Sequence, residues 1–220
     1  MFPRCTSPSY GVRTLAFNVA AALILLCWAT VAGAQPAPKV LALGDSLTAG
    51  YGLPPEQAFP VRLEARLRAE GVPVSIINAG VSGDTTAGGK ARLNWALAEK
   101  PDYAIVALGA NDALRGLSPV QAQANLDAIL TELKKRNIPV LLLGMLAPPN
   151  FGPDYRQQFN AIYPALAEKH GVPLYPFFLE GVAMQRDLNQ ADGIHPNQKG
   201  VEILVEKIAP AVKTLVATKG

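Results

Sequence analysis

The sequence predicts a single α/β domain in which helices cover both faces of a parallel β-sheet. Short, continuously apolar segments alternate along the chain with segments of helical periodicity, and this alternation is typical of a parallel sheet buried on both faces. No linker, repeat or low-complexity tract interrupts the chain after Lys39. The folded part is long enough for one domain with one sizeable core.

The first half of the chain predicts three strands and two helices. The first strand has the sequence KVLAL and ends at Gly44. In the first helix, Phe59, Leu63 and Leu67 recur at four-residue spacing, and Gly71 ends the segment. The predicted elements are, in order, a strand over 39–43, a helix over 59–70, a strand over 74–77, a helix over 87–100 and a strand over 103–108.

The second half predicts three helices and two strands. Its first helix has Ser118 as the N-cap and Pro119 at the first helical position. Gly171 closes the second helix, and Pro210 indicates a bend or an early stop in the third. The predicted elements are, in order, a helix over 119–136, a strand over 140–143, a helix over 155–170, a strand over 174–175 and a helix over 197–215.

The N-terminal segment has the layout of a secretory signal peptide. Arg4 and Arg13, with no acid nearby, precede an almost unbroken apolar run over Leu15–Val31. The tripeptide Ala32–Ala34 then places small residues where a signal peptidase reads. We therefore expect a signal peptide over 1–34 and a periplasmic or secreted mature protein.

Two other uses of this segment fit less well. As an uncleaved membrane anchor, the apolar run is slightly short for a span of about 20 residues. A lipoprotein signal needs a small residue before its cysteine, and Leu26 precedes Cys27. We expect one mature domain over 35–220, with no stable membrane span. Because Cys5 and Cys27 are removed with the signal peptide, the mature chain has no thiol and no disulfide.

Composition and motifs exclude several functional classes. Loss of the signal peptide lowers the formal net charge from +3 to +1, and no basic cluster is interleaved with aromatic residues, so a nucleic-acid partner is not expected. Gly88, Gly89 and Lys90 resemble a phosphate-binding loop, but position 84 is Asp and position 91 is Ala. The mature chain has two distant histidines and no cysteine, which disfavours a zinc site. No cofactor or metal is implied.

Ser46 is the candidate nucleophile. It follows the first strand by two residues, so its hydroxyl is expected at the carboxyl edge of the sheet, where open α/β sheets bind ligands. The segment is not a Gly-x-Ser-x-Gly elbow, because Thr48 stands where the last glycine would be. We interpret the neighbouring Asp45 as an acid that stabilises the turn rather than as a catalytic group.

His195 is the candidate general base, and Asp192 is the candidate acid that orients it. The two residues lie three apart in a glycine-containing loop, and such a turn can bring a carboxylate beside the imidazole Nδ1 while Nε2 points elsewhere. The alternative is a solvated Asp-Gly turn before a helix. The other histidine, His170, is expected at a helix end, where a basic residue favours the dipole without any function.

Asn111 and Gly80 are the candidates for an oxyanion hole. Asn111 follows the third strand and Gly80 follows the second, so a side-chain amide and a backbone N–H can point at one place. Simpler alternatives remain for each residue: an Asx-turn for Asn111 and a turn with positive φ for Gly80.

Apolar loops at the same edge of the sheet are expected to line the substrate pocket and to bind an apolar acyl chain. The loops over 109–117, 146–151 and 176–182 are rich in Leu, Pro and Phe. Their proline-rich parts can equally be rigid connections without a binding role. The expected substrate-binding residues are Leu114, Leu146, Pro148, Phe151 and Phe178.

These islands together resemble the SGNH (or GDSL) hydrolases, over essentially the whole chain from Lys39 to the last helix. The resemblance is greatest to the bacterial periplasmic branch of arylesterases and multifunctional thioesterase/lysophospholipases. Ala110 stands where many relatives have a second glycine. The matching blocks are Gly44-Asp45-Ser46-Leu47, Gly80, Gly109-Ala110-Asn111-Asp112 and Asp192-Gly193-Ile194-His195-Pro196.

The resemblance implies a flavodoxin-like three-layer α/β/α fold with five parallel strands. It implies a serine esterase acting on small acyl or aryl esters, and by extension on thioesters and lysophospholipids, with Ser46 as nucleophile, His195 as base and Asp192 as acid. It adds the Ser46 N–H to Gly80 and Asn111 as a third oxyanion donor. A carbohydrate O-deacetylase with the same triad and a non-catalytic binding module are the alternatives. We expect a monomer.

Overall fold

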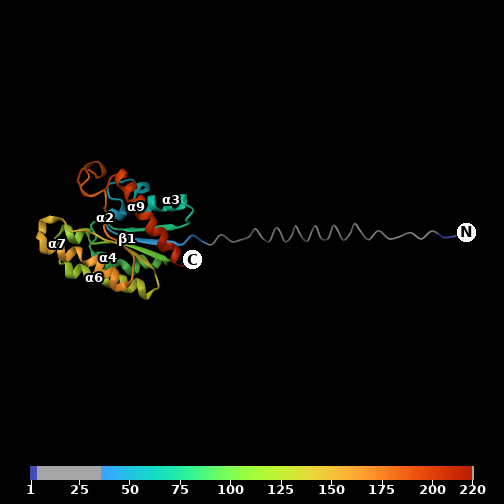
Figure 1. Cartoon of the computed structure of the whole chain (residues 1–220), viewed down its shortest axis with the longest axis horizontal. Coiled ribbons are helices and arrows are strands. Elements are labelled where there is room, and N and C mark those ends of the chain that lie inside the picture. Colours follow the sequence, from blue (N-terminus) through green and yellow to red (C-terminus); the bar gives the residue numbers. More distant parts are fainter. Residues whose placement is uncertain (4–35, 220) are drawn as a thin grey trace. The chain divides into compact units, whose positions relative to one another are not determined.

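A five-stranded parallel sheet with strand order β2-β1-β3-β4-β5 forms the centre of the folded domain (Figure 1). The structure is a computed structural model, and it describes residues 1–3 and 36–219. The predicted signal peptide and its cleavage site therefore lie, apart from residues 1–3, outside the described residues. The strands are β1 (Lys39–Gly44), β2 (Ser75–Gly80), β3 (Tyr103–Ala107), β4 (Val140–Leu143) and β5 (Leu174–Tyr175).

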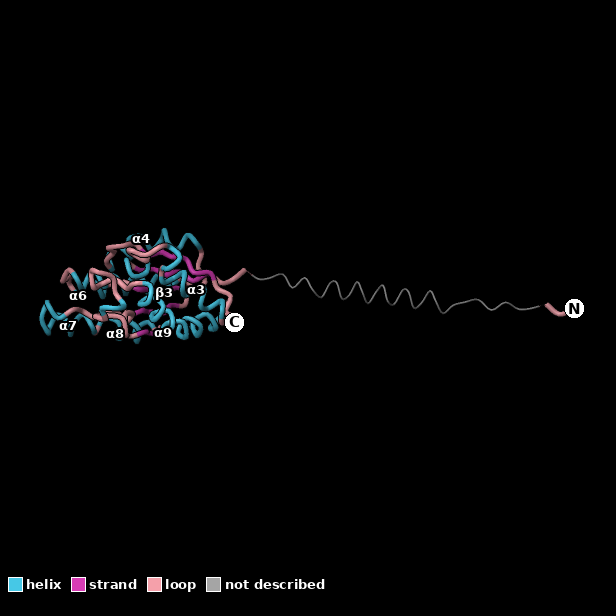
Figure 2. The backbone as a smooth tube through the Cα atoms, turned by 90° about the horizontal axis from the view of Figure 1, so that it is seen from above, coloured by secondary structure: helices cyan, strands magenta, loops and turns pink. Residues whose placement is uncertain are grey.

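Helices cover the sheet on both faces, as predicted. Helices α3 and α9 pack together on one face, whereas α4 packs on α6, and α6 on α8, on the other (Figure 1). Seen from above, the strands are enclosed between helices (Figure 2). The helices are α2 (Ser46–Ala49), α3 (Phe59–Ala69), α4 (Thr86–Ala96), α5 (Ala110–Leu114), α6 (Pro119–Lys135), α7 (Gly152–Asn160), α8 (Ile162–His170) and α9 (Gln198–Val216), with short 3₁₀ turns at 55–57, 97–99, 149–151, 186–188 and 217–219.

The register of the three central strands brings their carboxyl ends level. Gly44, at the end of β1, lies opposite Gly80 of β2 on one side and opposite Ala107 of β3 on the other. The chain crosses over here, since β1 has its two sequence successors on opposite sides. In open α/β sheets such a switch point opens a crevice at the carboxyl edge.

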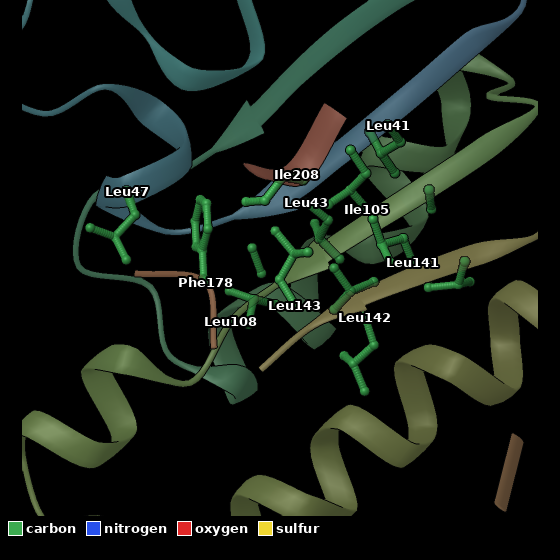
Figure 3. Close-up of a cluster of buried hydrophobic side chains, with 14 of the residues drawn as sticks. Leu41, Leu43, Leu47, Ile105, Leu108, Leu141, Leu142, Leu143, Phe178 and Ile208 are labelled. Atoms are coloured by element: carbon green, nitrogen blue, oxygen red, sulfur yellow. The ribbon is translucent and has the colours of Figure 1, made fainter. Parts of the chain in front are cut away.

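The core lies between the sheet and its helices. Leu41, Leu43 and Ile105 are fully buried on the central strands, and Ile208 of α9 belongs to the same buried cluster (Figure 3). Burial of each such side chain contributes roughly 1.5–3 kcal/mol, so β1 is firmly held on both sides. This anchors the end of β1, from which the candidate nucleophile emerges.

Four elements differ from the sequence-based expectation. The predicted helix over 155–170 is two helices, because Pro164 has no N–H to donate to the carbonyl of Asn160, where α7 ends. Pro210 does not stop α9, which continues to Val216 because its apolar face is buried on both sides of the proline. The short α2 and α5 were not predicted. None of the helices in the described part of the chain is long and apolar enough to cross a membrane.

Candidate active site

Ser46 is the first residue of α2, directly beyond the end of β1. Asp45 is its N-cap: the Asp45 carboxylate accepts a hydrogen bond from the Leu47 N–H at 3.0 Å. This agrees with the interpretation of Asp45 as a turn-stabilising acid. At the other end of α2, Gly50 has φ of 82° and closes the helix in the left-handed region. The hydroxyl is thus presented by a short, doubly capped turn.

The structure brings Ser46, His195 and Asp192 together in one hydrogen-bonded chain. The His195 Nε2 lies 2.9 Å from the Ser46 Oγ, and the His195 Nδ1 lies 2.7 Å from the Asp192 Oδ2. In the neutral tautomer that fits these contacts, Nδ1–H donates to the carboxylate and Nε2 accepts the serine proton. Ser46 and His195 are 149 residues apart in the sequence.

A tight turn holds Asp192 against His195. The Asp192 Oδ1 accepts hydrogen bonds from the backbone N–H groups of Ile194 and His195, at 2.9 and 3.0 Å, while Gly193 takes a φ of 72°. These bonds from His195 and Ile194 to the carboxylate lower the pKa of Asp192 to about 2. The carboxylate is therefore ionised throughout the neutral range.

Sequence reasoning missed two residues that contact this unit. The Tyr51 ring contacts the His195 imidazole in a tilted arrangement, with ring centroids 4.6 Å apart. The Gln190 Nε2 donates to the backbone carbonyls of Tyr51 at 2.8 Å and Pro196 at 3.0 Å, and the Gln190 N–H donates to the His195 carbonyl at 2.8 Å. Gln190 thus ties the loop after α2 to the loop that carries the base. No sequence motif marks either residue.

Asn111 lies in α5, and its amide is held by a neighbouring loop. The Asn111 Nδ2 donates to the backbone carbonyl of Asp84 at 2.9 Å. This contact occupies one of the two N–H groups of the amide and fixes its plane, which leaves the other for a ligand. The side chain therefore reaches a second loop rather than only closing a turn of its own.

Gly80 ends β2 against α2. A Cβ at Gly80 would come within 2.2 Å of the Ala49 N, so close approach explains the glycine. The alternative of a positive φ at Gly80 is wrong, since Gly80 is absent from the residues with positive φ. The Gly80 N–H donates to the Asn78 Oδ1 at 3.0 Å. A substrate oxyanion would accept this N–H either together with the Asn78 Oδ1 or in place of it.

Asp45 is fully buried beneath the nucleophile. Its Oδ1 accepts a hydrogen bond from the Leu47 N–H, whereas its Oδ2 has no hydrogen-bond partner among the described residues. Burial raises the pKa of Asp45 to about 7, and the Leu47 N–H and the nearby His195 only partly offset this effect. Asp45 and Asp192 are thus two acids with opposite protonation preferences.

Four of the five expected substrate-binding residues lie at least partly open to solvent. Leu114, Leu146 and Phe151 are exposed and Pro148 is half-buried. The loops of Leu114 and Phe151 are in contact: a Cβ at Gly116 would lie 2.6 Å from the Phe151 ring. Tyr155, which sequence reasoning also missed, braces them, because its hydroxyl donates to the Leu117 carbonyl at 2.9 Å.

The assignment of Phe178 to the substrate pocket is wrong. Its side chain has no exposed surface and packs edge-on against Phe59, with ring centroids 4.9 Å apart, within the core (Figure 3). The Phe178 N–H donates to the Gly144 carbonyl at 2.8 Å, which keeps this part of the loop close to the end of β4. The ring is therefore directed inward, where its burial is favourable.

His170 lies apart from this site. It ends α8, as expected, and its Nε2 contacts the Asp127 carboxylate at 2.7 Å. A cavity of about 300 Å³ beside it is lined by Leu130, Lys134, Asn137, Ile138, Pro139, Val140 and Val172. Within residues 1–3 and 36–219, no group of three or more His, Cys, Asp or Glu side chains could hold a metal ion.

Comparison with known proteins finds that this chain is similar to esterases. Residues 42–203 match the model of the GDSL-like lipase/acylhydrolase family. The chain is 42% identical over 206 residues to "Esterase TesA" of Pseudomonas aeruginosa, covering 93% of this chain and all of that one. It is 40% identical over 184 residues to "Thioesterase 1/protease 1/lysophospholipase L1" of Escherichia coli (strain K12), covering 83% and 87% of the two chains. The crystal structure of AlinE4, an SGNH-hydrolase family esterase, is 52% identical, with a TM-score of 0.70 over 82% of this chain and 97% of that one.

Proposed function

Because the chain belongs to the GDSL-like lipase/acylhydrolase family and is a serine esterase, we propose that Ser46, His195 and Asp192 carry out its acyl transfer. The observation that carries this assignment is the continuous hydrogen-bonded chain from Asp192 through His195 to Ser46. An acid, a base and a hydroxyl in this order form the unit that activates a serine nucleophile.

In the first half of the reaction, the Ser46 Oγ attacks the ester carbonyl carbon. Its proton passes to the His195 Nε2, and the ionised Asp192 stabilises the resulting imidazolium through Nδ1–H. The Oγ–carbon bond forms as the carbonyl π bond opens to an oxyanion. His195 then gives the proton to the leaving oxygen, the ester bond breaks, and an acyl-enzyme remains.

The oxyanion is assigned to three donors: the Ser46 N–H, the Gly80 N–H and the Asn111 amide. Ser46 follows the end of β1 by two residues, Gly80 ends the neighbouring β2, and the fixed plane of the Asn111 amide supports its part. Each donor of this kind contributes about 2.7–4 kcal/mol to transition-state stabilisation. In the second half, His195 takes a proton from water as the water oxygen attacks the acyl carbon. It then returns this proton to the Ser46 Oγ as the bond between Oγ and the acyl carbon breaks and the acid leaves.

The proposed substrates are esters of short to medium acyl chains, aryl esters included, with thioesters and lysophospholipids as further substrates. The exposed apolar side chains of Leu114, Leu146 and Phe151 on loops at the carboxyl edge support an apolar acyl group. One relative is named as a thioesterase and lysophospholipase, which supports the wider range.

We also propose that the mature enzyme spans residues 35–220 and is periplasmic or secreted. The basic segment, the apolar run and the small residues at Ala32–Ala34 support export and cleavage before Gln35.

Replacement of Ser46 by Ala tests the proposed nucleophile. Ser46→Ala should fold normally yet lose essentially all hydrolysis of p-nitrophenyl esters and all labelling by a fluorophosphonate probe, because the attacking oxygen is gone. Ser118→Ala is the control, since Ser118 is exposed at the N-cap of α6. Near-wild-type turnover by Ser46→Ala would show that another residue is the nucleophile.

A further inference from the structure

We propose that Arg92 and Asp84 are positioning residues that hold the oxyanion hole together. This inference rests on the proposed function and deepens it. Neither residue contacts the triad. Through one ion pair they connect the end of β1, the loop after β2 and the amide of Asn111.

The ion pair lies between α4 and the loop that precedes it. The Arg92 Nε lies 2.5 Å from the Asp84 Oδ2. The side chains are only 17% and 16% exposed, respectively, in contrast to the surface pair of Arg62 and Glu202, whose side chains are 42% and 43% exposed. A pair this well shielded is screened little by salt, so its geometry is held firmly.

One end of the connection reaches the nucleophile and Gly80. The Arg92 Nη2 donates to the Gly44 carbonyl at 2.8 Å, and the same carbonyl accepts from the Val81 N–H at 3.1 Å. Gly44 lies two residues before Ser46, and Val81 directly follows Gly80. Arg92 therefore holds the Gly44 carbonyl in place. This carbonyl connects the chain before Ser46 to the chain after Gly80, the two residues whose backbone N–H groups are the proposed oxyanion donors.

The other end reaches Asn111. The carboxylate of Asp84 binds Arg92, while its backbone carbonyl accepts from the Asn111 Nδ2 at 2.9 Å. The Asp84 N–H donates to the Val81 carbonyl at 3.1 Å, so residues 81–84 form one closed turn. The angle at which Asn111 presents its second N–H thus depends on where Arg92 holds Asp84.

The surroundings leave Asp84 little freedom. A Cβ at Gly88 would lie 2.4 Å from the Asp84 Oδ1, so only a glycine at this position in the first turn of α4 leaves room for the carboxylate. On the other side of Asn111, the buried Asp112 accepts from the Thr86 N–H at 2.8 Å and from the Thr86 hydroxyl at 2.7 Å. These contacts keep the two loops together when the ion pair is altered, so a change at Arg92 should displace donors without unfolding the site.

The test compares Arg92→Lys, Arg92→Met and Asp84→Asn with wild type on a p-nitrophenyl ester. We expect kcat to fall about 10- to 100-fold and KM to change less than about threefold, because a misplaced donor is lost mainly in the transition state. Lysine keeps the charge but cannot reach Asp84 and Gly44 with a planar fork, so Arg92→Lys should rescue only part of the loss. Arg62→Lys, in the exposed pair with Glu202, is the matched control and should leave kcat unchanged.

A double-mutant cycle with Asn111→Ala separates positioning from a general structural effect. Asn111→Ala alone should lower kcat about 100-fold or more. If Arg92 acts through the oxyanion hole, Arg92→Met should lower kcat by clearly less in that background than in wild type, because only its effect on the two backbone donors remains. An undiminished effect there, or a wild-type kcat for all three single variants that remain folded by circular dichroism, would overturn the inference. Loss of activity in Ser46→Ala together with a silent Arg92 would reject only this inference and leave the esterase mechanism standing.

Discussion

Asp192 and Asp45 lie close to the reacting serine, and their surroundings move their pKa values in opposite directions. Hydrogen bonds from His195 and Ile194 lower the pKa of Asp192 to about 2, whereas burial raises that of Asp45 to about 7. When two acids are separated in this way, one stays charged to orient a base and the other is neutral over much of the pH range. We therefore expect the protonation of Asp45 to make the stability of the fold, rather than the catalysed reaction, depend on pH.

We predict that the free energy of unfolding of the wild type falls between about pH 4 and pH 7, and that Asp45→Asn removes this fall. The pKa of Asp45 rises from 3.8 to about 7 on folding, so within this window the folded state keeps a proton that the unfolded state has lost. The stabilisation is complete below the lower value and is lost as the pH rises through the upper one, up to about 4 kcal/mol in all. Urea unfolding at pH 4, 6 and 8 measures the free energy of unfolding of both proteins.

The control for that series is Asp127→Asn, for which the sign is reversed. Lys169 and His170 lower the pKa of Asp127, so its contribution is present above the unfolded pKa and is lost as the pH falls. From pH 4 to pH 8 the Asp45→Asn variant should gain on wild type, whereas the Asp127→Asn variant should stay nearly parallel to wild type, because Asp127 is ionised in both the folded and the unfolded state above its unfolded pKa. Parallel curves for wild type and Asp45→Asn would show that Asp45 is ionised in the folded protein.

At the residue scale, the sequence predicted the groups that sit in short motifs, some at strand ends and some in the loop before α9. Ser46, Asn111, Asp192 and His195 lie where their motifs indicate. Tyr51 could not be predicted, because its role depends on a contact with a residue more than 140 positions away. Phe178 was misassigned, since a loop sequence does not say which of its apolar side chains turn inward.

At the element scale, strands were predicted to within about three residues, because continuous apolar runs mark a buried parallel sheet clearly. The missed elements are α2 and α5, of four and five residues. Neither completes enough turns for an apolar periodicity, and each exists because caps and tertiary packing hold it. They nevertheless carry Ser46 and Asn111, so the most functional helices of the domain are the least visible in its sequence.

We predict that Pro210→Ala stabilises the enzyme without changing its activity. Pro210 is exposed inside α9 and cannot donate to the carbonyl of Glu206, whereas alanine restores that bond and is the best helix former. The greater freedom of the unfolded alanine chain offsets part of the gain, which leaves about 1–2 kcal/mol. Thermal unfolding should show a higher Tm, with unchanged kcat. A lower Tm would mean that α9 needs a bend at this point.

We predict that the loops at the carboxyl edge set the preference for acyl chain length. Each buried methylene contributes at most about 0.8 kcal/mol, or roughly fourfold, so kcat/KM should rise gradually along a p-nitrophenyl ester series and then fall. Leu146→Ala and Phe151→Ala should weaken the rise while leaving acetate nearly unaffected. Val61→Ala, exposed on α3, is the control. Strict preference for acetyl groups on a polysaccharide would instead indicate a deacetylase.

At the scale of the whole molecule, we predict that the exported protein begins at Gln35. The prediction follows from the small residues at Ala32–Ala34, and N-terminal sequencing of material from a bacterial periplasm measures it. Ala34→Leu should block cleavage and leave a longer, membrane-retained form, whereas Gln35→Asn should be processed normally. A mature N-terminus upstream of Leu23 would mean that the signal is retained.

The acid and the base of this enzyme come from one four-residue turn, and this affects how activity arises as the chain folds. The Asp192–His195 unit assembles from neighbours, so its formation costs little loop-closure entropy. One long-range contact, between His195 and Ser46, then remains to be made. During synthesis the nucleophile and the oxyanion donors emerge early, and their base emerges only after all five strands of the sheet. A nascent or truncated chain that has folded its sheet is therefore catalytically silent, and hydrolysis begins only when the C-terminal segment docks.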